Sequence, residues 1–202
     1  MSVNRRAVVV GGLASIAAPH IARAETLTDA AGRAVAIPSR MERVFPAGPP
    51  AAITHYTLQP RTLLGSPRAN RGAELIYLDP DVATRPELGR LTGRGNTTNL
   101  EDLLQLRPDL ILDIGSTART FVETADRVQA QTGIPYALLD GRFEAIPASY
   151  RLHGRLVGET AWAEELARYC EDIVATCRSR VASVPRERRP RVYYARGPRG
   201  LD

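Results

Sequence analysis

The residues from 97 to 113 constrain the fold most, because they encode a capped helix, a break and a buried strand in succession. Asn99 is suited to cap a helix that begins directly after it, and acidic residues in the first turn favour the positive end of the helix dipole. Pro108 ends the helix because it lacks an N–H, and it predicts an extended backbone at Arg107. Residues 110–112 are short and apolar, as in a strand covered on both faces. A helix that leads directly into such a strand is half of a parallel α/β unit.

The same pattern recurs along the chain. Strands are expected near residues 44, 63, 111 and 137, with helical pattern between them, which predicts a parallel sheet with right-handed crossovers. A hairpin over residues 26–37 is expected to decorate an edge. The fold class is therefore α/β, with a parallel-sheet, Rossmann-like lobe. Ligands of such sheets bind beyond the carboxyl ends of the strands, so we expect the loop 113–119 to face a ligand.

The leucines of the expected helix after Asn99 are predicted to share one apolar face; they are Leu100, Leu103, Leu104 and Leu106. A second helix is expected over residues 118–132, ended by Gly133. Both helices would cover the sheet.

The first 24 residues have the features of an export signal. They contain no acidic group, begin with Arg5 and Arg6 ahead of a short apolar run, and end in an Ala-x-Ala motif at residues 22–24. A membrane-spanning helix needs about 20 apolar residues, and this run is shorter. We expect residues 1–24 to send the protein to the periplasm by the Sec or the twin-arginine route.

The composition excludes several classes of protein. Of 202 residues, 44% are hydrophobic and 24% are charged, as in soluble globular proteins. All 27 basic residues are arginine, which we attribute to coding bias, and no basic run is interleaved with aromatic residues, so no nucleic-acid partner is expected. Cys170 and Cys177 lie seven residues apart on one expected helix. Their separation of about 10 Å is too long for a disulfide, and we interpret them as buried free thiols.

The last third of the chain changes to a helical pattern. Helices are expected over residues 149–156 and 161–184, and the second, about 36 Å long, could connect two lobes. Residues 191–194 are expected to open a new strand shortly before the sequence stops. A strand without a partner cannot bury its faces, so the sequence predicts a truncated chain in which a second α/β lobe is largely missing.

Together these features resemble the periplasmic binding proteins of ABC importers for iron complexes, of the siderophore, heme and cobalamin type. The resemblance covers nearly all of the chain after the leader. It rests on a Gly-rich turn after the first strand and on the segments Asn-Leu-Glu-Asp-Leu-Leu at 99–104, Arg-Pro-Asp-Leu-Ile at 107–111 and Thr-Gly-Ile-Pro at 132–135. Residues 191–201 resemble the opening of the second lobe in a subgroup that takes iron complexes or oxyanions.

The resemblance implies two α/β lobes joined by one rigid helix. It divides the chain into a signal peptide (1–24), an N-terminal α/β lobe (25–148), a helical connection with the long interlobe helix (149–189) and the start of a truncated C-terminal lobe (190–202). It implies a monomeric, non-enzymatic binding protein without a cofactor. Such a protein captures a ferric siderophore-like complex or another anionic metal species and delivers it to a permease and its ATPase in the inner membrane. Glu74 or Glu87 could dock to permease arginines.

The expected ligand-binding residues lie on loops that leave the strands or just after the first turn. Arginine grips carboxylate-like and phosphate-like oxygens through a bidentate fork, so four arginines near one rim favour an anionic ligand. The candidates are Arg68, Arg94, Asn96, Arg119, Arg142, His55 and Tyr56. The metal ligands stay unknown, because no carboxylate is spaced to help His55 and a helical Tyr77 is interpreted as packed.

Two alternatives remain open. An exported hydrolase on a doubly wound sheet would need a nucleophile elbow, and the nearest sequence, around Ser66, lacks its second glycine. After removal of the leader, His55 and His153 would be the only candidates for its base. The second alternative is a truncated fragment with no function of its own.

Overall fold

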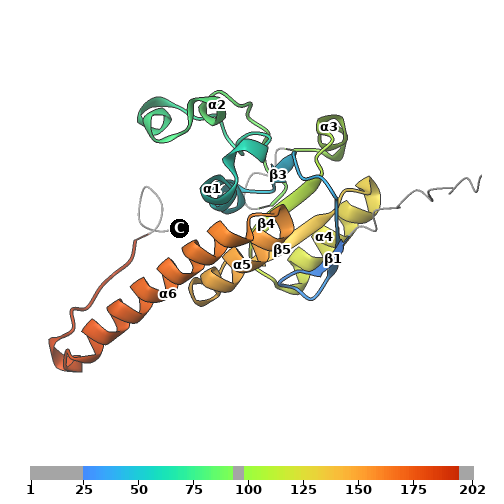
Figure 1. Ribbon diagram of the computed structural model, residues 1–202. Coiled ribbons are helices and arrows are strands. Elements are labelled where there is room, and N and C mark those ends of the chain that lie inside the picture. The colour runs from blue at the N-terminus through green and yellow to red at the C-terminus, as the bar shows by residue number, and fades with distance from the viewer. Residues whose placement is uncertain (1–24, 93–97, 196–202) are drawn as a thin grey trace, which may run out of the picture.

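A three-stranded parallel sheet forms the centre of the structure, a computed structural model that describes residues 25–92 and 98–195 (Figure 1). The strands are β3 (Val44–Pro46), β4 (Leu110–Gly115) and β5 (Tyr136–Asp140), in the order β3-β4-β5. The expected parallel α/β architecture is confirmed. The expected signal peptide, residues 1–24, lies outside the described residues, as do Arg94 and Asn96.

The expected strand near residue 63 is reduced to a single parallel bridge between Val44 and Leu63. A 3₁₀ turn, η1 (Pro60–Thr62), precedes the bridge. The guanidinium of Arg85 donates to the carbonyls of both Pro60 and Leu63, at the start of this turn and just after its end. Leu63 and β4 lie on opposite sides of β3, so the order of the chain reverses between β3 and β4. Such a reversal is the switch point where open α/β sheets bind ligands.

Helices cover both faces of the sheet (Figure 1). One core cluster joins the sheet to the helices α1 (Pro49–Leu58), α5 (Ile146–Val157) and α6 (Thr160–Ala182). The other joins it to α3 (Leu100–Leu106) and α4 (Arg119–Thr132). The strands can be apolar on both faces because neither face meets water. Between Leu63 and α3 the chain makes a 3₁₀ helix, η2 (Gly72–Tyr77), and a short helix, α2 (Pro80–Ala83).

The expected hairpin is formed by β1 (Glu25–Thr28) and β2 (Ala34–Ile37), but it is more than a decoration. In its turn, Ala30 N donates to Leu138 O at 2.9 Å, and Leu138 N donates to the Asp29 carboxylate at 3.1 Å. These bonds satisfy backbone groups on the outer edge of β5. The hairpin therefore protects an edge strand that would otherwise expose its ladder.

The stretch from Asn99 to β4 matches the expectation in its cap and differs at its end. The Asn99 side chain accepts from Asp102 N at 2.8 Å, and Leu103 is fully buried, whereas Leu104 is 47% exposed. Arg107 is left-handed, with φ 46°, where an extended backbone was expected. This turn lets the carbonyl groups of residues 106 and 107 accept from Arg43, at 2.6 and 3.2 Å.

The helices α5 and α6 pack closely, as an antiparallel pair joined at Gly158, and α6 extends beyond the sheet (Figure 1). Arg151 reaches from α5 to Glu164 and Glu171 of α6, each at 2.6 Å. Both cysteines are free, as expected, but the expectation that both are buried is wrong, because Cys170 is half-buried and Cys177 is exposed. Two 3₁₀ turns, η3 (Phe143–Ala145) and η4 (Arg186–Arg188), flank this pair in the chain.

The expected strand at residues 191–194 is not formed. These residues lie at the end of the described range and have no regular secondary structure. A strand is stabilised by a neighbouring strand, and neither described sheet pairs with this segment. No helix within the described ranges has the length and apolar character needed to cross a membrane.

Candidate functional site

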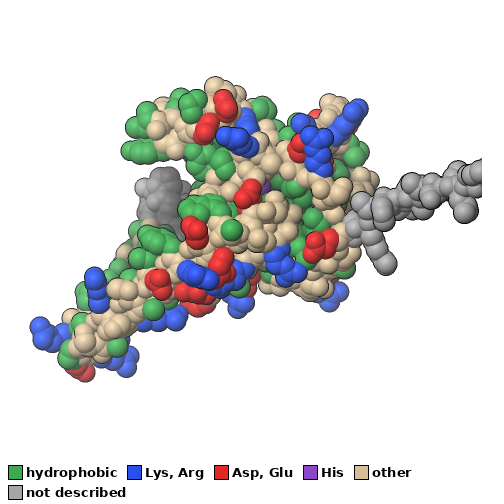
Figure 2. Space-filling view, in the orientation of Figure 1, with side chains coloured by type: hydrophobic (Ala, Val, Ile, Leu, Met, Phe, Trp, Pro, Cys, Tyr) green, Lys and Arg blue, Asp and Glu red, His purple; other side chains and the backbone are tan. Residues whose placement is uncertain are grey.

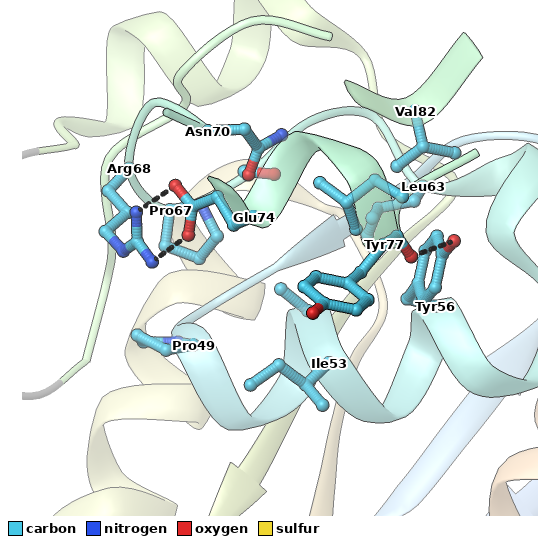
Figure 3. Close-up of a pocket in the computed structure, with 13 residues that line it drawn as sticks. Pro49, Ile53, Tyr56, Leu63, Pro67, Arg68, Asn70, Glu74, Tyr77 and Val82 are labelled. Atoms are coloured by element: carbon cyan, nitrogen blue, oxygen red, sulfur yellow. Dashed lines mark hydrogen bonds and ion pairs between the residues drawn. The ribbon is translucent and has the colours of Figure 1, made fainter. Parts of the chain in front are cut away.

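Two hollows open among the loops and helices that follow the carboxyl ends of the strands. The first, which we call the α1 groove, has a volume of about 310 Å³ and lies between α1 and η2 (Figure 3). The second, which we call the loop pocket, has a volume of about 590 Å³ and lies between the loops after β4 and β5. The loop after β4, which we expect to face a ligand, lines the loop pocket through residues 115–118.

The α1 groove is mainly apolar. Ile53, on the outer face of α1, is 67% exposed, and Tyr77, at the end of η2, is 78% exposed. Tyr77 was interpreted as packed, and this is wrong. Figure 2 shows hydrophobic side chains gathered around α2 and its neighbouring turn. A concave surface lined by exposed apolar side chains is the usual form of a small-molecule site.

Tyr56, one of the expected ligand-binding residues, lines this groove. Its hydroxyl accepts a hydrogen bond from Asp79 N at 2.8 Å and donates to Tyr77 O at 3.4 Å. The hydroxyl therefore ties η2 to α1 and sets the distance between the walls of the groove. The ring, rather than the hydroxyl, is what Tyr56 can offer to a ligand.

Arg68, a second expected residue, also lines the groove, but its guanidinium already has a partner. Arg68 Nη1 lies 2.7 Å from Glu74 Oε1, and Nη2 lies 2.6 Å from Glu74 Oε2. This is the bidentate geometry that an incoming carboxylate would otherwise adopt. The hydrogen bonds from Arg68 and then from Arg71 N lower the pKa of Glu74 to about 2.

The loop pocket is formed where two glycines meet. Gly141 N donates to Gly115 O at 2.8 Å, and a Cβ on Gly141 would lie 2.8 Å from the Gly115 Cα. Arg142 lines this pocket and is paired with Asp140 at 2.6 Å. Arg119 follows the pocket at the start of α4 and is paired with Glu123 at 2.7 Å. All three described arginine candidates thus have a carboxylate partner within the chain, and they do not form one open anion cluster.

His55 lies in the core instead of the site. Its side chain is fully buried, Nδ1 lies 2.9 Å from His153 Nε2, and Nε2 lies 2.9 Å from Thr62 Oγ1. Burial, and secondarily the charge of Arg85, lowers the pKa of His55 to about 3. Adjacent residues on a helix point to different sides. His55 therefore faces the core although Tyr56, the next residue, lines the groove.

The same core pair bears on the hydrolase alternative and on metal binding. Ser66 lines the α1 groove, but both described histidines, His55 and His153, are fully buried, with lowered pKa values. Neither is placed as a solvent-accessible base. Within the described part of the chain, no three His, Cys, Asp or Glu side chains gather in a way that could hold a metal ion.

Asp113 was expected to begin the loop after the strand, without a role of its own, but it lies within β4 and is buried. The hydroxyl of Tyr136 and that of Thr92 each donate to its carboxylate at 3.2 Å. Burial raises the pKa of Asp113 despite these hydrogen bonds. The available signal was an acidic residue inside an apolar run, between Leu112 and Ile114.

Comparison with known proteins places this geometry in context. A family model described as periplasmic binding protein matches residues 66–201. The structure is similar to an ABC transporter solute binding protein from Sulfurospirillum deleyianum, with a TM-score of 0.72 and 24% identity over 85% of this chain and 54% of that chain. No curated protein sequence matches the chain.

Two further solved structures bind different ligands. The molybdate-binding protein MolA of Haemophilus influenzae has a TM-score of 0.67 and 16% identity over 85% of this chain and 58% of that chain. The heme binding protein HmuT has a TM-score of 0.55 and 22% identity over 86% of this chain and 54% of that chain. The chain thus spans about half the length of these structures. At these identities the similarity concerns the fold.

Proposed function

The chain belongs to the periplasmic binding protein family, and we propose that it serves as the solute-binding component of an ABC importer that captures an iron complex in the periplasm. The family consists of substrate-binding proteins rather than enzymes. In this proposal the ligand is a ferric siderophore-like chelate. It is delivered to a permease and its ATPase in the inner membrane.

The observation that carries this proposal is the α1 groove at the carboxyl end of the sheet. Its exposed apolar wall, with Ile53 and Tyr77, suits the organic surface of a chelate, which can bury apolar area there. A small inorganic oxyanion is supported less well. It would need open arginine forks, and Arg68, Arg119 and Arg142 are each paired with a carboxylate.

The proposal also assigns the parts of the chain. Residues 1–24 act as the signal peptide, 25–148 as the ligand-binding lobe, 149–189 as the helical connection and 190–202 as the beginning of a second lobe. We propose that the protein works as a monomer. Glu87 is exposed, which suits docking to a permease arginine, whereas Glu74 is engaged by Arg68.

Trp162 provides the test. It is the single tryptophan of the protein, and its indole N–H donates to Thr57 O, at the end of the helix that forms one wall of the groove. We expect a ferric trihydroxamate, a chelate whose ferric centre carries no net charge, to change its fluorescence saturably and to raise the melting temperature. At a ligand concentration of about 100 times Kd, the stabilisation should reach about 2.7 kcal/mol.

The controls decide where a ligand binds and what it is. Ile53→Glu should abolish the response by placing a charge in the groove, while Ile173→Glu, at an exposed position of α6, should leave it unchanged. Iron-free chelators and molybdate serve as comparison ligands. A response to molybdate alone, or no response to the ferric trihydroxamate, would contradict the proposal.

A further inference from the structure

We propose that Glu74 is a built-in counter-ion for Arg68, which makes the α1 groove select ligands with an uncharged apolar surface and reject anions. The inference rests on the proposed function in taking the groove as the ligand site. It adds a specificity-determining residue and a charge class to that site. The first support is the fork itself: both terminal nitrogens of Arg68 are occupied by the two oxygens of one carboxylate, at 2.7 and 2.6 Å.

The counter-ion is held in place independently of Arg68. Glu74 lies in the first turn of η2, and its Oε1 also accepts a hydrogen bond from Arg71 N at 2.5 Å. An anionic ligand would therefore have to displace a carboxylate that the backbone has already positioned. Because these hydrogen bonds lower the pKa of Glu74 to about 2, the carboxylate is charged at neutral pH.

The other residues that line the groove are mainly apolar. Figure 3 shows the Arg68–Glu74 pair at one end of the groove and the rings of Tyr56 and Tyr77 at the other. Ile53 and Pro49 lie along the wall of α1 between them. A ligand gains here by covering apolar side chains and stacking on aromatic rings. An anionic group set into this end would face the Glu74 carboxylate, and the guanidinium of Arg68 is already paired with that carboxylate.

Two fluorescent probes that differ by one charged group test this selection. N-phenyl-1-naphthylamine is neutral, and 8-anilinonaphthalene-1-sulfonate carries the same two ring systems with an added sulfonate. We expect the parent protein to bind the neutral probe more tightly than the sulfonate. Glu74→Gln keeps the shape of the side chain but frees the charge of Arg68. It should tighten binding of the sulfonate about tenfold and leave the neutral probe within about twofold.

Matched variants locate the effect. The double variant Glu74→Gln with Arg68→Gln should lose the gain for the sulfonate, because the guanidinium that receives it is gone. Ile53→Glu should remove binding of both probes, whereas Ile173→Glu on α6 should remove neither. Thermal melts followed by circular dichroism confirm that each variant is folded. The change at Glu74 lies on the surface, where its side chain is 32% exposed.

The outcomes separate this inference from the proposed function. Equal affinity of the parent protein for both probes, or an equal change for both in Glu74→Gln, overturns the inference. If the probe ratio shifts as expected but no ferric chelate affects Trp162, the charge selection stands and the iron-complex function fails. If chelates bind and the probe ratio does not move, the function stands and the role of Glu74 fails.

Discussion

The imidazoles of His55 and His153 face each other in the core, with His55 Nδ1 2.9 Å from His153 Nε2 and the ring centroids 5.1 Å apart. The pair joins α1, a wall of the α1 groove, to α5, which packs against α6. Among the described residues, His153 Nδ1 is the one buried side-chain polar atom without a hydrogen-bond partner. A charge on either ring would therefore be poorly compensated.

This pair predicts an acid-labile fold. Burial lowers the pKa of both histidines, that of His55 to about 3. Below about pH 6.5 both histidines take up protons in the unfolded chain but stay neutral in the folded chain. The free energy of unfolding therefore falls as the pH falls. We expect a slope of about 1.4 kcal/mol per pH unit for each histidine between pH 6 and 4, measured by urea denaturation. His153→Gln should remove one histidine's share, and an unchanged slope in that variant would contradict the assignment.

A second prediction concerns the contact between α5 and α6. A Cβ on Gly154 would lie 2.3 Å from Ala163 Cβ and 2.9 Å from Glu159 O, so Gly154→Ala must push the helices apart. We expect a loss of about 1–3 kcal/mol in the free energy of unfolding, although alanine is the better helix former. Adding Ala163→Gly should restore part of the loss. If the single variant is as stable as the parent, the close packing is not required.

A third prediction concerns the hairpin that covers β5. The Asp29 carboxylate is buried and accepts from Leu138 N and from the guanidinium of Arg33, each at 3.1 Å. Asp29→Ala leaves three backbone donors, Ala31 N, Arg33 N and Leu138 N, and a mostly buried cation without this partner, so we expect a loss of about 3 kcal/mol or more in urea denaturation. Asp126→Ala removes the other, exposed carboxylate partner of Arg33 and should cost less than about 1 kcal/mol. If both variants lose the same free energy of unfolding, Asp29 contributes only a negative charge near Arg33, and its hydrogen bonds to the backbone are not important.

A fourth prediction concerns the end of α3. Arg107 has a φ of 46°, which costs a residue with a side chain about 1 kcal/mol and costs glycine little. Arg107→Gly should therefore raise the free energy of unfolding by about 0.5–1 kcal/mol. Arg107→Ala removes the same side chain and keeps the penalty, so it should show no gain. A gain in both variants would trace the effect to the side chain.

Much of the fold could be predicted from local signals. The cap at Asn99, the stop at Pro108 and Gly133, and the apolar run of β4 each act within a few residues, and the structure agrees with them. The strand at Leu63 could not be predicted correctly in the same way. It is reduced to a single bridge with Val44, and its carbonyl group accepts from Arg85, which lies 22 residues away in the chain.

The candidate site was harder to predict because a side chain's availability depends on its neighbours in space. Tyr56 and Arg68 do line one groove, yet Glu74 occupies the guanidinium and Asp79 N occupies the hydroxyl. His55 is one residue away from Tyr56 and lies in the core. The i,i+4 spacing of Arg119 and Glu123 on an expected helix was a signal for one filled arginine, whereas the pairing of Arg68 with Glu74 depends on the turn before η2.

The sequence by itself determined the α/β class, the order of the helices and strands and the edge of the sheet at which loops gather, because caps, prolines, glycines and periodicity act locally. Only the tertiary structure decided which polar groups remain free at that edge. It set η2 beside α1 through the bond between Asp79 N and the Tyr56 hydroxyl, and it buried His55 against His153. These contacts join segments far apart in the chain, whereas Arg119 with Glu123 and Arg142 with Asp140 pair with near neighbours in the sequence.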